Sequence, residues 1–262
     1  MADVPDNNYV VGAGKIYFDQ FVDDTFDTTG ERYLGNTPAL TLSLSIDKLD
    51  HYGSDYAVKV KDASITLQED STGSFQTDNI DADNLAMWFN AIRSTEMQAI
   101  AAAATETIDG VKLGRYYQIG RTDARPQGVG GLTAFTTLKV GAGTITALDN
   151  YTVDLARGRI YILPTSEDIT EGDDIILTYD LGASTTETIT TGGKTVIGAM
   201  RFIADNRAGD NRDYFWPYVK LTPNGDLALK GDTWEAVTFD FEVLLLNSVV
   251  ERQYITRVVP AA

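Results

Sequence analysis

The chain offers few side chains that could carry out catalysis. It contains no cysteine and a single histidine, His51, which excludes thiol nucleophiles, disulfides and Cys-ligated metal centres. A Ser–His–Asp site would have to use His51 with Asp47, Asp50 or Asp55, its neighbours in sequence. No Gly-x-Ser-x-Gly nucleophile elbow is present in the sequence. We therefore expect His51 to lie at a surface or an interface.

Carboxylate clusters are the remaining candidates for metal binding or acid–base catalysis. They occur in the stretches DNIDADN (78–84), SEDITEGDD (166–174) and DNRAGDNRD (205–213). None has the alternate spacing and the final bidentate Glu of an EF-hand loop, and none specifically indicates a glycosidase carboxylate pair. We expect a helix cap in the first, a turn between strands in the second, and arginine-paired carboxylates in the third. The sequence predicts no catalytic residue, no metal and no cofactor.

A glycine-containing segment near the start, VGAGK (11–15), could be mistaken for a phosphate-binding loop. A P-loop requires Ser or Thr after its Lys, whereas Ile16 follows Lys15. We expect a plain loop that leads into a strand.

The charge of the chain restricts its partners. Its 38 acidic and 21 basic side chains give a net charge of −17, which disfavours binding to DNA phosphates and to anionic membranes. The first residues, MADVPDNNY, lack the basic and apolar regions of a secretory signal, and the apolar runs are too short to span a bilayer. We therefore expect no membrane partner.

The charges are unevenly distributed along the chain. Residues 111–160 carry seven basic and three acidic side chains, a net +4, and residues 161–190 carry a net −7. Blocks of opposite sign are compatible with self-association and equally with ordinary surface variation.

Alternating apolar and polar residues predict a mostly β protein. Residues 40–47 place Leu and Ile on one face and small polar residues on the other, and a similar pattern covers 237–245. A short polar link at 49–56 is expected before the next strand, which begins near Val58. Further strands are expected at 15–21, 115–119, 132–140, 143–147, 151–154, 158–163, 174–180, 185–190, 195–204 and 214–221, with a turn at Arg157-Gly158.

One segment favours a helix. Residues 82–92 are rich in large apolar side chains and follow Asp81, a candidate N-cap together with Asp83. The alanine-rich stretch that follows, within 95–107, can be read as helix or strand. Glycine-rich loops mark residues 108–192 as a β-rich elaboration of one domain that spans 1–262.

Three stretches resemble a known family when taken in order. They are KIYFDQF…GERYLGNTPALTLSLSIDKLDHYGSD, ASITLQEDSTGSFQTDNIDADNLAMWF, and GAMRFIADNRAGDNRDYFWPYVKLTPNGDLALKGDTWEAVTFDFEVLL. Together they cover roughly residues 1–92 and 195–247. Their order is similar to that of the major tail tube proteins of bacteriophages with long, non-contractile tails.

The resemblance implies a structural protein with no enzymatic activity. Such proteins have a β-sandwich or barrel fold with one short helix, and their strands complete a ring-shaped inner β-barrel on oligomerisation. Hexameric rings of the protein stack into a tube around a tape-measure protein, and the tube meets tail terminator and distal tail proteins. DNA later passes through its lumen without specific binding. The implied location is the virion tail, assembled in the cytoplasm of the host bacterium.

Two sets of residues are candidates for roles in such a tube. The polar faces of the two alternating strands would line the lumen, although they could equally face outer solvent; these residues are Thr41, Ser43, Ser45, Asp47, Asp240 and Glu242. Contacts between subunits would use the link 49–56, with its tyrosines Tyr52 and Tyr56, and the basic block; the candidates are His51, Tyr52, Arg115, Arg121 and Arg125.

Two other functions stay open. The chain could be a different tail or virion component, such as a carbohydrate-binding accessory protein. An acidic β-rich hydrolase is the remaining alternative.

Overall fold

The computed structural model describes residues 8–22, 25–55 and 57–257; the first seven residues and Tyr56 lie outside the described part. The protein is mostly β, with one short helix and several antiparallel sheets. It consists of two compact units, one formed by Met1–Arg93 with Ile189–Ala262 and the other by Ser94–Thr188. Most of the segment 108–192 therefore belongs to the second unit.

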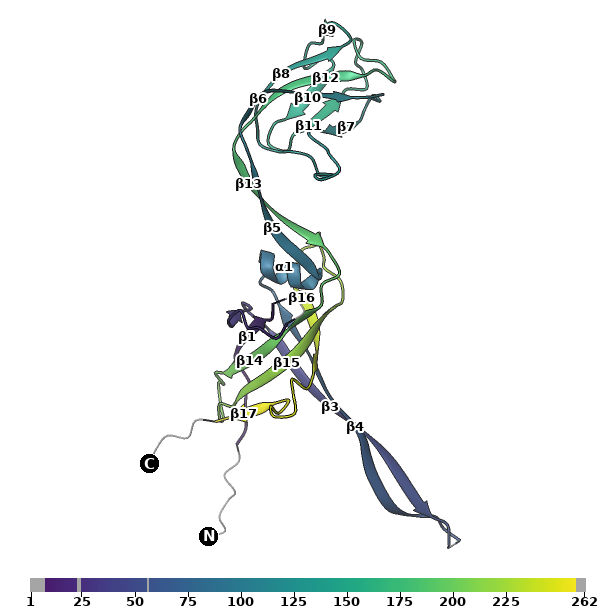
Figure 1. The fold of residues 1–262 in the computed structure, drawn as a ribbon, viewed down its shortest axis with the longest axis vertical. Coiled ribbons are helices and arrows are strands. Elements are labelled where there is room, and N and C mark those ends of the chain that lie inside the picture. The colour runs from purple at the N-terminus through teal and green to yellow at the C-terminus, as the bar shows by residue number, and fades with distance from the viewer. Residues whose placement is uncertain (1–7, 23–24, 56, 258–262) are drawn as a thin grey trace, which may run out of the picture. The chain divides into compact units, whose positions relative to one another are not determined.

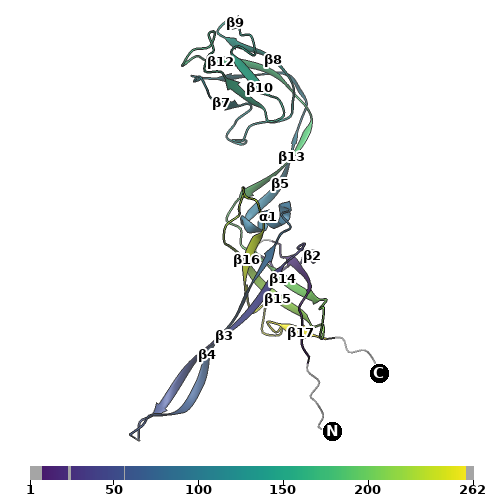
Figure 2. The same cartoon turned by 180° about the vertical axis from the view of Figure 1, so that it is seen from behind.

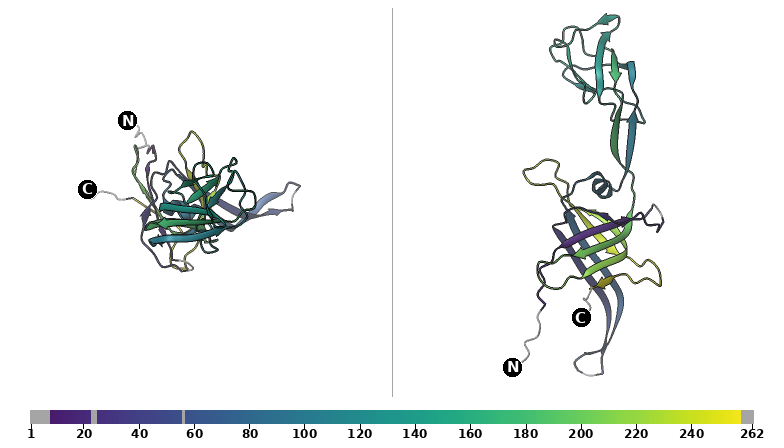
Figure 3. Two further views of the ribbon diagram at one scale, coloured as in Figure 1. Left: turned by 90° about the horizontal axis from the view of Figure 1, so that it is seen from above. Right: turned by 90° about the vertical axis from the view of Figure 1, so that its left-hand side faces the viewer.

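The first unit is built on one eight-stranded sheet (Figure 1). Its order is β2-β1-β14-β15-β16-β4-β3, with β17 paired to β15. The strands are β1 (Gly14–Gln20), β2 (Arg32–Tyr33), β3 (Ala39–Gly53), β4 (Val60–Thr77), β14 (Val196–Ala204), β15 (Asp213–Asn224), β16 (Val237–Val243) and β17 (Tyr254–Thr256). The right-hand view of Figure 3 shows how these strands curve. Within the described residues no sheet closes into a barrel.

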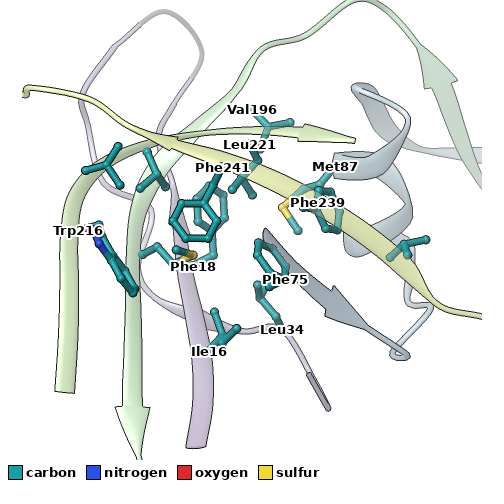
Figure 4. Close-up of a cluster of buried hydrophobic side chains, with 14 residues drawn as sticks. Ile16, Phe18, Leu34, Phe75, Met87, Val196, Trp216, Leu221, Phe239 and Phe241 are labelled. Carbon is teal, nitrogen blue, oxygen red and sulfur yellow. The ribbon is translucent and has the colours of Figure 1, made fainter. Parts of the chain in front are cut away.

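Alternate residues of these strands form the core of the first unit. On β16, for example, Val237, Phe239, Phe241 and Val243 are buried, and the residues between them are more exposed. Figure 4 shows the rings of Phe239 and Phe241 packed with side chains from the neighbouring strands and with Met87 from the helix. The core comprises Ile16, Phe18, Leu34, Phe75, Met87, Val196, Met200, Trp216, Val219, Leu221, Val237, Phe239, Phe241 and Val243.

The helix α1 (Ala82–Trp88) is shorter than the expected 82–92. It begins as expected, because the Asp81 side chain caps it by accepting a hydrogen bond from the Asn84 N–H, at 2.7 Å. It ends early because Asn90 adopts a positive φ of 50°, a left-handed conformation that redirects the chain. Ile92 consequently lies in the next strand, β5 (Ala91–Gln98).

The alanine-rich region is β-structure rather than helix. It contains the end of β5, which pairs with β13 (Ser184–Thr191), and β6 (Ala101–Ile108), which pairs with β12 (Ile175–Leu181). The intrinsic helical preference of alanine amounts to a few tenths of a kcal/mol per residue. Pairing with two distant strands outweighs that preference here.

The second unit contains two sheets that share one core. The four-stranded sheet has the order β6-β12-β8-β9 and the three-stranded sheet the order β10-β11-β7; Figure 1 labels these strands. The remaining strands are β7 (Tyr116–Gln118), β8 (Leu132–Val140), β9 (Gly143–Thr144), β10 (Tyr151–Asp154) and β11 (Arg159–Ile162). Leu138 and Leu177 from one sheet pack with Ile160 and Ile162 from the other. The expected turn lies between β10 and β11, where Gly158 has a φ of 61°.

The expected polar link at 49–56 is wrong for most of its length. Strand β3 continues to Gly53 and stays paired with β4 throughout, ending at the pair Gly53–Val60. Polar contacts between the strands replace the apolar alternation there: Lys61 Nζ lies 2.6 Å from Asp50 Oδ1, and Ser64 donates to the same carboxylate. Among the described residues, no helix is long and apolar enough to cross a bilayer.

Candidate self-association surface

The hairpin formed by β3 and β4 extends beyond the sheet of the first unit. Strand β16 pairs with β4 only at Ser71–Thr77, so residues 45–53 and 60–70 form strand pairs only within the hairpin. One contact from outside it is made by Arg252, which donates to the Glu69 carbonyl at 2.8 Å and to its carboxylate at 3.0 Å. Figures 1 and 2 show this ribbon running away from the other strands of that unit. Nearly every residue of β3 is exposed. A two-stranded ribbon without a covered face is marginally stable in water.

Strand β3 also leaves one edge unpaired. It is the last strand in the sheet order, so within the described residues β4 is its sole neighbour. Its 15 residues therefore present a row of outward-facing N–H and C=O groups. Proteins usually shorten, cover or interrupt such edges because they invite pairing with another chain.

The structure brings the six lumen candidates together on one face of one sheet. Cross-strand partners share a face, and two rows of partners cross three strands: Thr41, Ser74 and Asp240 in one, and Ser43, Thr72 and Glu242 in the next. All six candidates are exposed; they are Thr41, Ser43, Ser45, Asp47, Asp240 and Glu242.

Electrostatics give this polar face a predominantly negative character. Asp70 lies opposite Ser45 and adds a fourth carboxylate to Asp47, Asp240 and Glu242. Lys220 lies opposite Glu242 on β15. Asn224 donates to both carboxylate oxygens of Asp240, at 2.9 and 3.0 Å. The face therefore combines fixed negative charge with short hydroxyl side chains.

The opposite face of the hairpin is apolar on β3 and largely exposed, whereas its partners on β4 are Gly73, Ser71 and Glu69. Leu40 packs against the core, but Leu42, Leu44 and Ile46 are 42%, 60% and 45% exposed. We call these three residues the apolar face. Apolar side chains that share one exposed face mark contact surfaces more often than isolated ones do.

A groove adjoins the apolar face at the base of the hairpin. It has a volume of about 690 Å³, and its lining includes Leu40 and Leu42 together with Phe202, Tyr214 and Trp216. The rings of Tyr214 and Trp216 are stacked with their centroids 5.8 Å apart. The apolar face and the groove thus form one continuous surface within the first unit.

The hairpin tip carries the candidates His51 and Tyr52. The His51 Nδ1 atom contacts the Asp62 carboxylate across the strands, and Tyr52 is 50% exposed. The pKa of Asp50 is lowered, first by the hydrogen bond from Lys61 and then by that from Ser64. These polar pairs join β3 and β4 near the tip.

The three arginine candidates lie in the second unit, apart from the candidates of the first unit along the chain. Arg125 forms an ion pair with Glu96 of the same unit, at 3.3 Å, so part of its charge is already balanced. Arg115 and Arg121 are exposed and lie on either side of β7.

The carboxylate clusters serve local structure. Asp173 accepts from the N–H and hydroxyl of Thr170, Glu171 accepts from the Leu113 N–H, and Asp210 pairs with two arginines, Arg212 and Arg257. In the part of the chain that the structure describes, no three His, Asp or Glu side chains gather as metal ligands would.

Sequence reasoning missed the apolar face as an exposed surface. The alternation at 40–47 predicts a half-buried strand, whereas the buried half extends only to Leu40. The sequence signal that could have revealed it is the length of the strand. The extended pattern continues into Lys48–Tyr52 without Gly, Pro or Asn to end it, so the strand exceeds the typical five or six residues.

Comparison with known proteins places the chain in a family. Residues 9–253 match a family model described as protein of unknown function UCP028589. No curated protein matches the chain. Since the match covers nearly all of the sequence, the chain belongs to the family of proteins of unknown function UCP028589.

Proposed function

We propose that the protein is a structural subunit that associates with further copies of itself into rings, which stack into a tube of the bacteriophage tail type. The observation that carries this proposal is the β3–β4 hairpin: it has a free edge, a polar face and an uncovered apolar face. The sequence resemblance to major tail tube proteins of phages with long, non-contractile tails points to the same function.

Self-association would meet the requirements of each of these surfaces. Pairing the β3 edge with a strand of a neighbouring copy satisfies its outward N–H and C=O groups. Covering Leu42, Leu44 and Ile46 removes apolar surface from water at roughly 25 cal/mol per Å². The contact would be heterologous because β3 meets a different part of the next copy, and heterologous contacts close into rings or continue as filaments.

The polar face would line the channel of the ring. Its carboxylates at positions 47, 70, 240 and 242 would repel DNA phosphates, so a genome could pass without being retained. In this arrangement the strands of all copies form one inner barrel. Each copy by itself then needs no closed barrel, in keeping with its open sheet.

The remaining expectations follow from the tail-tube proposal. The tube would enclose a tape-measure protein, would end at terminator and distal tail proteins, and would belong to the virion tail after assembly in the host cytoplasm. The protein would act without a catalytic site or cofactor.

Negative-stain electron microscopy of the purified chain tests this function. We expect rings or tubes with a central channel at high protein concentration. A chain that stays monomeric at every concentration, by light scattering as well, would contradict the proposal.

A hairpin-shortened variant makes the test specific. Replacing residues 44–71 with Asn-Gly removes Leu44 and Ile46 and joins the paired residues Ser43 and Thr72 by a two-residue turn. This variant should retain the circular dichroism of the folded chain and lose assembly, since the core lies outside the removed residues.

A further inference from the structure

We propose that the second unit contains a binding groove for a neutral oligosaccharide. The groove lies between the end of β6, the strand β7 and the loop that follows β7, with a volume of about 760 Å³. This size is in the range of small-molecule sites. The residues lining it include Glu106, Asp109, Tyr116, Tyr117, Gln118, Arg121 and Asp123.

Two tyrosines, Tyr116 and Tyr117, provide the aromatic part of the groove. Tyr116 is 59% exposed, and its ring lies 4.4 Å from that of Tyr161 and beneath the Arg159 guanidinium, at 4.6 Å. These contacts hold the Tyr116 ring in place. Because Tyr161 and Arg159 lie against the ring, Tyr116 offers a ligand its exposed edge and its hydroxyl, which can donate to or accept from sugar hydroxyls.

Glu106 provides a fixed hydrogen-bond acceptor. Its Oε2 atom accepts from the Gly120 N–H, at 2.7 Å, and from the buried Tyr179 hydroxyl, at 3.4 Å. Because Tyr179 is only 5% exposed, one oxygen of Glu106 is anchored from inside the unit. The other oxygen, Oε1, is thereby oriented in advance to accept from a ligand hydroxyl.

The charges around the groove favour a neutral ligand rich in hydroxyl groups. Glu106, Asp109 and Asp123 outnumber Arg121, which disfavours phosphates and other anions. The described residues hold no cluster of three metal-ligating side chains, so divalent-cation binding has no support. Carboxylate and guanidinium groups beside a tyrosine hydroxyl leave a polyhydroxylated ligand as the best chemical match.

This inference is independent of the β3–β4 hairpin that carries the proposed function, because every residue on which it rests lies within Ser94–Thr188. Isothermal titration calorimetry of the full chain against maltohexaose, cellohexaose and chitohexaose tests it. We expect at least one to bind with a dissociation constant below about 1 mM. No binding of any of the three would overturn the proposal.

Substitutions then locate the site. Tyr116→Ala and Glu106→Gln should each raise the dissociation constant about tenfold or more, with circular dichroism and melting checked for an intact fold. Trp234→Ala is the matched control, since Trp234 is an aromatic residue of the first unit with 95% exposure. Arg121→Ala provides a second test of the groove, in which the dissociation constant for the sugar is again compared with that of the parent chain. Arg121 is exposed, so its replacement should leave folding intact. Equal affinity in all variants would place the sugar elsewhere and overturn the assignment.

Discussion

The ring of Phe241 on β16 occupies the space that a Cβ atom at Gly73 of β4 would fill. This contact lies where the hairpin leaves the core: Gly73 is paired on its other side with Leu42, the first exposed leucine of β3. Toward Phe75 the sheet covers a packed interior, and toward Asp70 it becomes a ribbon in solvent. The absence of a side chain at Gly73 lets the last core aromatic pack directly against the sheet.

Substitution of Gly73 tests this packing. Gly73→Ala should lower the free energy of unfolding by about 1–3 kcal/mol, because the added methyl group displaces the Phe241 ring or the backbone beside Thr41. Urea denaturation measures the change. Gly231→Ala is the control, since a Cβ there meets nothing within 4 Å, and its effect should stay within about 0.5 kcal/mol. Equal stability of the two variants would show that the ring is not confined.

The apolar face should be required for assembly and dispensable for folding. We expect Leu44→Asp combined with Ile46→Asp to abolish rings or tubes in negative stain, because the charges would have to be buried at the contact. The melting temperature should change little, since both side chains are largely exposed. Leu229→Asp, at a residue with 77% exposure, serves as the control and should still assemble. Normal tubes from the double variant would exclude this face from the contact.

Cysteine labelling can determine where the polar face lies. The chain has no cysteine, so Ser43→Cys introduces a single thiol on that face. If the face lines a channel, a 5-kDa polyethylene glycol maleimide should label Ser43→Cys much more slowly in tubes than in dissociated protein. Leu148→Cys, at an 80% exposed position of the second unit, should keep its rate. Equal slowing at both positions, or at neither, would argue against a lumenal position.

Ionic strength should alter assembly if the basic block contacts an acidic surface of another copy. The Debye length, over which charges interact in solution, falls from about 8 Å at 0.15 M salt to about 3 Å at 1 M. We therefore expect light scattering to give a different critical concentration at the two salt levels. Arg121→Glu, which reverses an exposed charge, should reduce that difference. If the parent chain assembles at the same critical concentration at both salt levels, charge pairing between copies does not contribute to assembly.

The second unit should lose stability at high pH through Tyr179. Burial, followed by the charge and the hydrogen bond of Glu106, raises the pKa of Tyr179 from 10.0 to about 12. The folded state therefore holds this proton more tightly than the unfolded chain does, and the resulting stability is complete below pH 10 and declines as pH rises toward 12.

Tyr179→Phe isolates that contribution. It removes the titrating group and keeps the ring, so unfolding of the second unit by urea should differ less between pH 9 and pH 11.5 than in the parent chain. Tyr116→Phe, at an exposed tyrosine of the same unit, should retain the parent's difference. An identical pH response in all three proteins would show that Tyr179 titrates alike in the folded and unfolded states.

The sequence by itself determined which side chains share a face and where the helix begins. Alternation at 40–47 and 237–245 grouped Thr41 with Ser43 and Asp240 with Glu242, because successive residues of a strand point to opposite sides. Asp81 was identifiable as a cap because its carboxylate can accept from an N–H in the first helical turn.

Only the tertiary structure decided what covers each face and where each element stops. Pairing with β16 ends at Ser71, and that long-range register leaves Leu44 and Ile46 in solvent, although their local pattern is that of a core strand. Glu106 and Tyr179 are 73 positions apart in sequence. They come into contact because β6 pairs with β12. Local periodicity fixes the direction of a side chain, whereas its burial depends on which distant strand lies against it.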